Sequence, residues 1–269
     1  MNAGDAAGRW GFQGRCDIPL RTLDNFVKNI VENIKPDLIL WTGDNPPHNP
    51  WGENYEDEIY EITKIFIDLL LNKYNYTKPV FPSIGNHEEY ISDQYNPYSR
   101  QREAEFLKAF GNFYKPWLSD EEYRSFIKNG YYTKKYLDTK LRIISINCFL
   151  CDNLNFFLIE NPTDPQGQFA WMEEVLRQAE KDGDYVFIIG HIPPGDSTYA
   201  SECSKRYQIL VDRFQNIIRG HFYGHTHYDE FRVLTEWNNK EKVAGVIFTA
   251  PSLTTYSFQN PSFRIYELE

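Results

Sequence analysis

The segment Leu38-Ile39-Leu40-Trp41-Thr42-Gly43-Asp44 decides which fold the sequence predicts. A short apolar run that ends at a glycine is typical of a buried strand in a parallel sheet. Gly43 is followed at once by the carboxylate of Asp44, and ligands of open α/β sheets bind beyond the carboxyl ends of the strands. Taken alone, a Gly-Asp pair after an apolar run indicates only a turn. Asp44 becomes a candidate ligand because the same arrangement recurs along the chain.

The arrangement occurs in three later segments, in which aromatic or β-branched residues lead into a glycine and a side chain that can bind a metal follows. These segments end in Gly85-Asn86-His87-Glu88, in Gly190-His191 and in Gly224-His225-Thr226-His227. Five of the six histidines lie in or beside the four segments. Because ligands gather at the carboxyl edge of such a sheet, the four segments together predict one shared site.

Length and composition limit the classes of protein that fit. The 269 residues suit one large α/β domain, so we assign residues 1–269 to a single domain. The 19 Tyr, 19 Phe and 6 Trp favour strands over a helical bundle. A net charge of −10 argues against a nucleic-acid polymer as partner. No apolar run approaches the roughly 18 residues of a transmembrane helix, and residues 1–15 lack the apolar core of a signal peptide.

Helices and strands are expected to alternate, as they do in βαβ units. Amphipathic or helix-like patterns predict helices at 21–35, 55–71, 102–110, 166–181 and 207–218, and strands are expected at 38–42, 79–84, 185–189, 243–249 and 263–268 and around Arg232. Residues 130–147 predict two antiparallel strands around an Asp138-Thr139-Lys140 turn. Residues 193–205 are expected to form a polar, mobile loop.

The residue types at the predicted site indicate a metal centre. Aspartate, asparagine and histidine without cysteine favour Zn²⁺, Mn²⁺ or Fe. His225 and His227 are two residues apart, so on an extended segment they face the same side. The carboxylate of Asp44 could bridge two ions. In hydrolases with two metals, ions roughly 3.5–4 Å apart activate a water and stabilise an in-line displacement.

The remaining polar residues of the segments have other expected roles. His87, next to Asn86, could protonate the leaving oxygen, a role that suits an imidazole near neutral pH. His48 could contact a phosphate oxygen or orient His87. Glu88 is expected to cap the segment rather than to bind a metal, and His221 is expected to be structural. The lone Cys148-x-x-Cys151 lacks the second pair that a zinc knuckle needs.

The glycine-ended motifs resemble the signature of calcineurin-like metallophosphoesterases. Longer strings resemble the acid sphingomyelinase family more closely: Cys16–Leu23, Trp41–His48, Gly190–Gly195 and Ala250–Tyr256. The similarity extends from about Trp10 to the last residue. The resemblance implies a four-layer α/β/β/α sandwich with a two-zinc site.

The resemblance also implies roles for the candidate residues. By it, Asp44 bridges the ions, a first site is completed by Asn86, His191 and His225, and His227 serves a second site. His87 would be the leaving-group acid and His48 the partner of the substrate phosphate. The implied reaction is hydrolysis of a phosphodiester, either sphingomyelin to ceramide and phosphocholine or a nucleotide-type substrate. Peripheral contact with a lipid surface would accompany the first substrate.

The resemblance bears on the cysteines and on the compartment as well. Cys151 and Cys203 resemble a disulfide pair of the family, which fits a secreted or lysosomal protein. Asn75-Tyr76-Thr77 matches the acceptor sequence for N-glycosylation.

The sequence departs from the family at one motif. Family members open with a strand that ends in Asp-x-His and supplies two ligands to the second site, but this sequence contains no Asp-x-His. The fold is therefore expected to lack its first strand, and Cys16 its partner; Asp5 and Asp17 stand in poor contexts to substitute as ligands. No saposin-like domain or C-terminal helical region is expected. Two hypotheses remain: a piece of an active phosphodiesterase, or a catalytically impaired homologue that binds one metal or a ligand without turnover.

Overall fold

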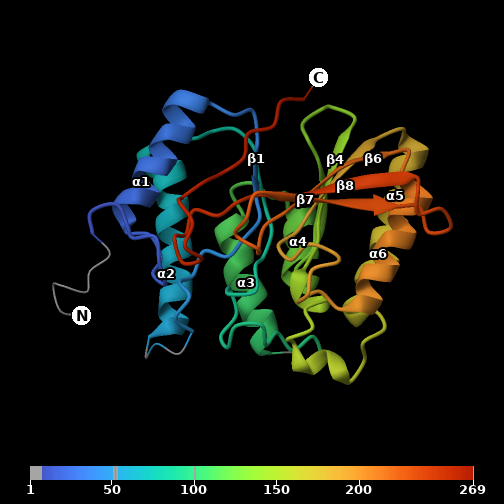
Figure 1. Cartoon of the computed structure of the whole chain (residues 1–269), viewed down its shortest axis with the longest axis horizontal. Helices are drawn as coiled ribbons and strands as arrows, with labels where there is room; N and C mark the ends of the chain where they lie inside the picture. The colour runs from blue at the N-terminus through green and yellow to red at the C-terminus, as the bar shows by residue number, and fades with distance from the viewer. Residues whose placement is uncertain (1–7, 51, 53, 100, 269) are drawn as a thin grey trace.

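The computed structural model describes residues 8–50, 52, 54–99 and 101–268. Two β-sheets lie between two layers of helices (Figure 1). The smaller sheet pairs β1 (Ile39–Trp41) with β2 (Val80–Pro82) in parallel. The larger sheet has the order β3-β4-β5-β6-β8-β7, formed by β3 (Tyr132–Lys135), β4 (Leu141–Ser145), β5 (Tyr185–Ile189), β6 (Ile218–Tyr223), β7 (Glu230–Thr235) and β8 (Val243–Thr249). The predicted α/β/β/α class is confirmed.

The larger sheet is parallel in its centre and antiparallel at its edges. Strands β4, β5, β6 and β8 run parallel to one another, and β3 and β7 pair in the opposite direction at the two edges. Their central positions are buried on both faces, which explains the nearly continuous apolar runs in the sequence. The carboxyl ends of β5 and β6 therefore point to the same side of the molecule.

The helices divide between the outer faces of the two sheets. In Figure 1, α1 and α2 lie on one side of the strands and α5 and α6 on the other. The first layer comprises α1 (Leu20–Asn29) with η2 (Ile30–Ile34), α2 (Tyr55–Asp68) with η3 (Leu69–Lys73), α3 (Arg102–Tyr114) and α4 (Asp120–Asn129). The second layer comprises α5 (Gln168–Asp182) and α6 (Ser201–Phe214), and short turns η4 (Cys148–Leu150), η5 (Phe156–Ile159) and η6 (Pro165–Gly167) precede α5.

Three apolar clusters hold these layers together. One joins the helices α1 to α4 to the outer face of the small sheet, and another joins α5 and α6 to the large sheet. Between the two sheets lie Phe81, Ile143, Phe187, Ile189 and Phe222. A fully buried side chain of this size contributes about 1.5–3 kcal/mol of burial free energy. The contact fixes β1 and β2 against the strands that carry the remaining site residues.

Four expectations about secondary structure were incomplete or wrong. Helix α3 continues to Tyr114, and α4 was not predicted, although Ser119 and Glu122 form a capping box at its start. Helix α6 begins at Ser201, within the expected loop, because its buried face starts at Cys203. Residues 263–268 form no strand; the tail packs instead by edge-to-face aromatic contacts, such as that of Tyr266 with Phe222.

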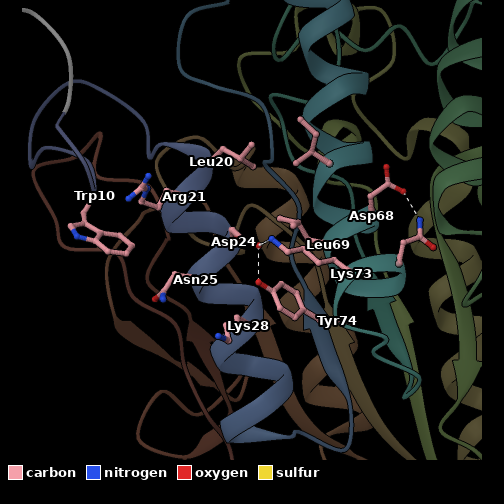
Figure 2. A pocket seen from close by; sticks show the side chains of 12 residues that line it. Trp10, Leu20, Arg21, Asp24, Asn25, Lys28, Asp68, Leu69, Lys73 and Tyr74 are labelled. Carbon is pink, nitrogen blue, oxygen red and sulfur yellow. Dashed lines mark hydrogen bonds and ion pairs between the residues drawn. The ribbon is translucent and has the colours of Figure 1, made fainter. Parts of the chain in front are cut away.

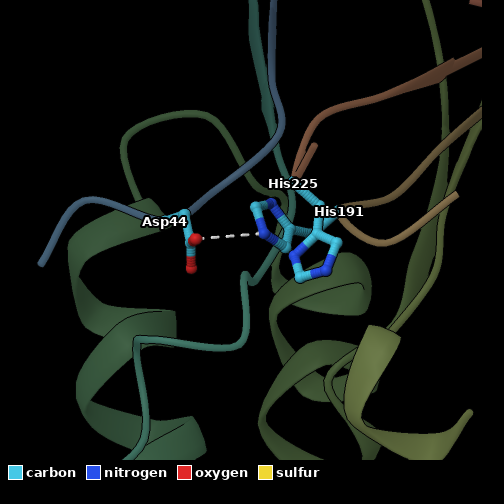
Figure 3. Close-up of side chains that lie close together, drawn as sticks. All are labelled: Asp44, His191 and His225. Atoms are coloured by element: carbon cyan, nitrogen blue, oxygen red, sulfur yellow. Dashed lines mark ion pairs between the residues drawn. The ribbon is translucent and has the colours of Figure 1, made fainter. Parts of the chain in front are cut away.

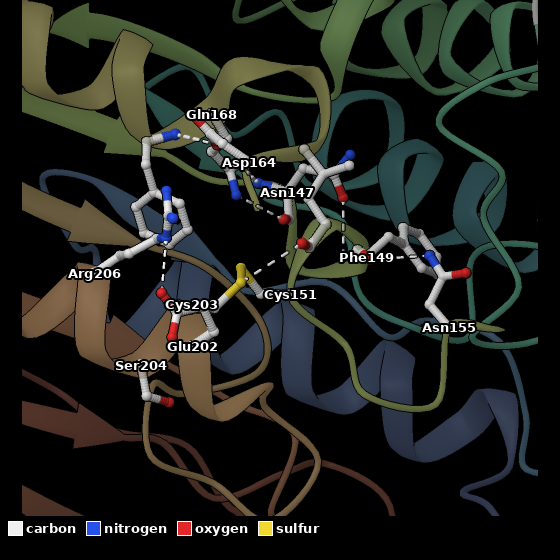
Figure 4. The surroundings of a disulfide bond; sticks show 12 residues. Asn147, Phe149, Cys151, Asn155, Asp164, Gln168, Glu202, Cys203, Ser204 and Arg206 are labelled. Atoms are coloured by element: carbon white, nitrogen blue, oxygen red, sulfur yellow. Dashed lines mark hydrogen bonds and ion pairs between the residues drawn. A yellow bond between two sulfur atoms is a disulfide. The ribbon is translucent and has the colours of Figure 1, made fainter. Parts of the chain in front are cut away.

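The start of α6 is anchored by the predicted disulfide. Cys151 and Cys203 are bonded (Figure 4). The backbone N–H of Ala200 donates to the carbonyl of Cys151. This bond excludes the Cys148-x-x-Cys151 pair as a zinc ligand set, as expected. Cys148 is a buried free thiol, and Cys16 is also free in the described part of the chain.

Candidate metal centre

Two glycines allow β1 and β2 to end against each other. Gly43 has a φ of +84°, and a Cβ there would lie 2.3 Å from the backbone nitrogen of Gly85. A Cβ on Gly85 would lie 2.5 Å from the backbone nitrogen of Asp44. Neither position tolerates a side chain, so the strand ends touch and bring Asp44 beside Asn86 and His87.

Three candidate ligands have a strained backbone conformation just after a strand. Asp44 follows β1, and His225 and His227 follow β6. Asp44, His225 and His227 have φ values of +66°, +72° and +66°. Left-handed conformations are uncommon for residues with a side chain and are concentrated at functional sites. Each of the three directly follows, or lies within three residues of, a glycine that ends a strand, so the chain turns sharply there. The turn brings their side chains toward one region.

The carboxylate of Asp44 lies at the centre of this region. His191 places Nε2 at 3.1 Å from Oδ2 of Asp44, and the backbone N–H of His87 donates to Oδ1 at 2.8 Å. Figure 3 shows Asp44, His191 and His225 converging from three separate segments, and their ligand atoms lie within 4.8 Å of one another. Burial opposes ionisation of Asp44, but attraction to His191 and His87 holds its pKa well below the ordinary value.

Glu88 supports this arrangement from behind. Its carboxylate accepts hydrogen bonds from the backbone N–H groups of Gly85, Asp44 and Asn45 and from the side-chain amide of Asn45. Burial and the nearby charge of Asp44 raise the pKa of Glu88 to about 7, whereas the four N–H donors favour the ionised form. Glu88 therefore ties the ends of β1 and β2 together, as expected for a capping residue.

His191 offers a lone pair to a positive charge. Its Nδ1 lies 2.8 Å from the carbonyl oxygen of Thr42, which can only accept, so Nδ1 carries a proton. The buried Nε2 has no hydrogen-bond partner and faces the carboxylate of Asp44. Only a proton or a metal cation relieves that contact. Although burial lowers the pKa of His191, attraction to Asp44 raises it overall.

Asn86, like His191, is oriented by a hydrogen bond to a neighbouring residue. Its Nδ2 donates to Oδ1 of Asp93 at 2.9 Å, which leaves Oδ1 of Asn86 3.0 Å from Nδ1 of His225. The other ring nitrogen of His225 lies 2.9 Å from the hydroxyl of Thr198. Burial lowers the pKa of His225 to about 4, so this imidazole is neutral near pH 7. We call Asn86, His191 and His225 the inner side of the centre.

The outer side of the centre is formed by His48 and His227. Nδ1 of His227 lies 2.6 Å from Oγ of Ser257, and burial lowers the pKa of His227 to about 4. Nδ1 of His48 lies 2.8 Å from Oδ1 of Asp17, whose other oxygen accepts from the backbone N–H of His48. The ring of His48 stacks on Tyr256 with 4.2 Å between centroids.

His87 lies between the two sides. Its ring centroid is 4.8 Å from that of His48, and its Nδ1 lies 3.3 Å from the hydroxyl of Tyr55 and 3.4 Å from that of Ser92. The ring is therefore held by polar contacts on one nitrogen. Its other nitrogen, Nε2, makes no hydrogen bond within the described residues.

The structure thus brings together all seven predicted site residues, and it adds several that the sequence did not single out. The additions are Asp17, Tyr55, Ser92, Asp93, Thr198, Tyr256 and Ser257. Asp17 and Tyr256 belong to strings on which the family resemblance depends, which was a usable signal. Asp17 was expected only as a poor substitute ligand, and the structure pairs it with His48; Asp5 lies outside the described residues.

His221 has the structural role expected of it. It is buried on β6, its Nδ1 lies 2.6 Å from the hydroxyl of Tyr207, and burial lowers its pKa to about 3.

A hollow between α1 and η3 is lined by none of the candidate site residues (Figure 2). There Lys73 and Tyr74 both donate to Asp24, so the polar groups satisfy one another rather than converging on empty space.

Comparison with known proteins assigns the family. Residues 10–229 match the calcineurin-like phosphoesterases. The chain belongs to this family. Calcineurin-like phosphoesterases use divalent metals, and the group of Asp44, His191 and His225 could hold one. The donor set of the centre, a carboxylate and an amide oxygen with two imidazole nitrogens, fits such an ion.

Two curated relatives of this phosphoesterase are sphingomyelin phosphodiesterases. The chain is 37% identical over 266 residues to the protein of Bos taurus and 36% identical over 266 residues to that of Homo sapiens. These alignments cover 98% of this chain but 42% and 41% of the relatives. The cyclic GMP-AMP phosphodiesterase SMPDL3A of Bos taurus is 33% identical over 271 residues, covering 94% of this chain and 58% of that protein. The chain therefore spans about half the length, or less, of these relatives.

Solved structures support the phosphoesterase fold. A dimetal phosphatase from Danio rerio matches with a TM-score of 0.54 and 13% identity, covering 85% of this chain and 76% of that one. The structure of PhoD matches with a TM-score of 0.56 and 13% identity, covering 86% and 54%. At this identity the similarity extends to the fold alone.

Proposed function

We propose that this phosphoesterase is the catalytic part of a zinc-dependent phosphodiesterase. The observation that carries the proposal is the convergence of Asp44 with the inner side, where ligand atoms of Asp44, His191 and His225 lie within 4.8 Å of one another. Asp44, Asn86, His191 and His225 would hold one zinc ion, and Asp44 and His227 would contribute to a second. When bound, the ions would stabilise negative charge on the phosphoryl oxygens and lower the pKa of water for attack.

The protein's own residues would complete the displacement. Water attacks phosphorus while the bond from phosphorus to the leaving oxygen breaks in line with the new one. His87, held through Nδ1 by Tyr55 and Ser92, would pass a proton from Nε2 to the leaving oxygen. His48, whose Nδ1 faces Asp17, would direct Nε2 at a phosphate oxygen. The stacked ring of Tyr256 would restrict how His48 can turn.

Exposed apolar side chains on two segments that hydrogen bonds link to the centre favour a sphingolipid over a nucleotide as substrate. Large exposed apolar side chains come from two loops: Tyr90, Ile91 and Tyr98 from one, and Leu154, Phe156, Phe157 and Ile159 from the other. The loops are joined because Gln94 donates to the carbonyl of Leu154, and the first of them is tied to the centre through Asp93 and Asn86. Such a surface suits contact with the apolar part of a lipid. No described helix is long and apolar enough to cross a bilayer.

The experiment measures bound zinc and hydrolysis of bis-p-nitrophenyl phosphate on the same purified chain. We expect zinc and turnover in the wild type, and loss of both in Asn86→Ala. Asn72→Ala is the matched control, because the amide of Asn72 also donates to a carboxylate but lies on the surface. Hydrolysis of sphingomyelin vesicles faster than of a cyclic dinucleotide would support the lipid; the opposite preference would assign the nucleotide class.

A second candidate function is a one-metal relative without turnover. It is favoured by the unequal ligand sets: Asp44 and His227 alone would serve the second ion among the predicted ligands, against four for the first. The same experiment separates the two candidates. One zinc ion per chain without hydrolysis would support the relative, whereas turnover abolished by Asn86→Ala would reject it.

We also propose that the protein works in a secretory or lysosomal compartment. The disulfide between Cys151 and Cys203 supports an oxidising environment. Asn75 of the Asn-Tyr-Thr sequence is exposed, as a glycosylated residue must be. Expression in a secretory host followed by glycosidase treatment tests this: an unchanged mass would contradict modification at Asn75.

A further inference from the structure

The loop between β5 and α6 passes beside His225. Thr198, in this loop, has its hydroxyl oxygen 2.9 Å from Nε2 of His225 and 3.0 Å from Oδ1 of Asp196. The backbone N–H of Thr198 also donates to Oδ1 of Asp196 at 3.0 Å. On its other oxygen, Asp196 accepts from the guanidinium of Arg232 at 2.8 Å. A short chain of polar contacts therefore runs from β7 to a candidate metal ligand.

The hydroxyl proton of Thr198 can be donated either to Asp196 or to Nε2 of His225. Burial opposes ionisation of Asp196, but the bonds from Thr198 and Arg232 outweigh it and hold its pKa below the ordinary value. When the hydroxyl proton is donated to this ionised carboxylate, which can only accept, Thr198 faces His225 with a lone pair. Nε2 of His225 then carries the ring proton.

The opposite nitrogen of His225 is left for the metal. A neutral imidazole carries one proton, so Nδ1 has a lone pair, and it lies 3.0 Å from Oδ1 of Asn86. Asp93 has already fixed that atom of Asn86 as oxygen. Two acceptors thus face each other across the inner side. A cation is the partner that both of them can share.

We propose that Asp196 and Thr198 are positioning residues that hold the proton of His225 on Nε2 and so reserve Nδ1 for the metal ion. The proposal rests on the proposed function, because it concerns the ligands of that centre. The sequence predicted only a polar, mobile loop here, and the proposal gives two residues of that loop a role. Partners outside the metal ligands commonly set the tautomer of a ligating histidine, and their loss lowers metal affinity roughly 10- to 100-fold.

The loop is held firmly enough to carry out this role. The backbone N–H of Asn153 donates to the carbonyl of Thr198 at 2.8 Å, and Asp152 forms a β-bridge with Tyr199. The disulfide of Cys151 ties the same neighbouring segment to the start of α6. Thr198 is therefore attached on both sides, and its hydroxyl stays within reach of His225.

The test combines nitrogen NMR of the histidine rings with zinc affinity measured by competition with a chelator, both on the full chain. The His225 resonances are assigned by their loss in His225→Gln. In the metal-free wild type we expect the proton of His225 on Nε2. Thr198→Val should mix the two tautomers and weaken zinc binding about tenfold or more. Thr198→Ser should restore both properties, and Thr163→Val, the same substitution at an exposed threonine outside this loop, should change neither.

The outcomes separate this inference from the proposed function. A wild type that binds zinc, with equal affinity in Thr198→Val, would overturn the positioning role and leave the metal centre intact. A proton on Nδ1 in the metal-free wild type would overturn it whether or not zinc binds. Equal weakening by Thr198→Val and Thr198→Ser would also overturn it, because the hydroxyl would then be irrelevant. A wild type that binds no zinc would reject the proposed function, and the tautomer would still decide the inference.

Discussion

The inner and outer sides of the centre differ in the parts of the chain that support them. On the inner side, His191 and His225 follow strands of the large sheet, and Thr42 behind His191 follows β1. On the outer side, His48 is held by Asp17, and His227 by Ser257. Asp17 precedes the first described helix, and Ser257 follows the last strand. The partners of the outer side therefore lie in segments outside the sheets, although His227 itself follows β6, as His225 does.

This difference suggests a division of tasks. Strand ends buried between two sheets hold their side chains rigidly, which suits the narrow range of distances that a metal ion requires. Irregular segments tolerate sequence change more readily, and binding residues are common on them. We infer that the inner side holds its ion independently, whereas the outer side adapts to the substrate. Three predictions break or sharpen this comparison.

The largest effect is expected at His87, which lies between the two sides. His87→Gln should lower turnover of an alkyl phosphodiester by about 10²–10⁴-fold, because the leaving oxygen would lose its proposed proton donor. Zinc content should stay at the wild-type value, since His87 is not among the proposed ligands. Steady-state kinetics and metal analysis on one sample measure both quantities.

The leaving group provides the internal control for this variant. A nitrophenolate leaves without a proton, so hydrolysis of a nitrophenyl ester should fall much less than that of an alkyl ester. Equal losses of turnover for both esters would show that His87 acts on the fold or on metal binding. The proposed role of His87 as proton donor would then be rejected.

A smaller effect is expected at Asp17, on the outer side. Asp17→Asn weakens the contact that orients His48, so turnover should fall about tenfold, the lower end of the range for partners that orient site residues. The affinity of the inner side for zinc should not change. Asp24→Asn is the matched control, since Asp24 is held by Lys73 and Tyr74 away from the centre. Loss of the tighter-bound zinc in Asp17→Asn would abolish the proposed independence of the two sides.

The smallest effect is expected at Asp152, behind the inner side. Burial and the charge of Asp93 raise the pKa of Asp152 from 3.8 to about 8. Between about pH 4 and pH 8 the folded state keeps a proton that the unfolded state has released, so the stability that Asp152 shows at low pH declines as the pH rises and is lost by about pH 8. Asp152→Asn should raise the unfolding free energy at pH 6, because the unfolded wild type ionises Asp152 at that pH and an amide cannot ionise. At about pH 4, where Asp152 is largely neutral in both states, the change should be less than about 1 kcal/mol.

The measurement for this variant is urea unfolding of the metal-free chain at several pH values. Asp152→Asn should flatten the decline in stability between pH 5 and pH 9. Asp138→Asn, in an exposed turn, is the control and should leave the decline unchanged. A decline that is equally steep in Asp152→Asn would show that this carboxyl group is not the one that holds the extra proton.

The sequence predicted the inner side well because its signal is local. A strand ending in glycine and a ligand, as at Gly43-Asp44 or Gly190-His191, is visible within a few residues. The partners behind the ligands were not visible, because Asp17 and Thr198 contact histidines that lie 31 and 27 residues away in the chain. Their positions depend on the course of loops, for which the sequence offers no periodic pattern. The strand predicted at 263–268 was wrong because this segment packs by aromatic contacts and has no strand to pair with.

The left-handed backbone at Asp44, His225 and His227 bears on how this protein can evolve. Each such residue costs on the order of 1 kcal/mol or more relative to an unstrained conformation. Replacing any of them with glycine would relieve that cost and remove a ligand at the same time. Stability and function therefore oppose each other at these three positions, and a lineage released from catalytic selection would be expected to lose its ligands while gaining a more stable fold.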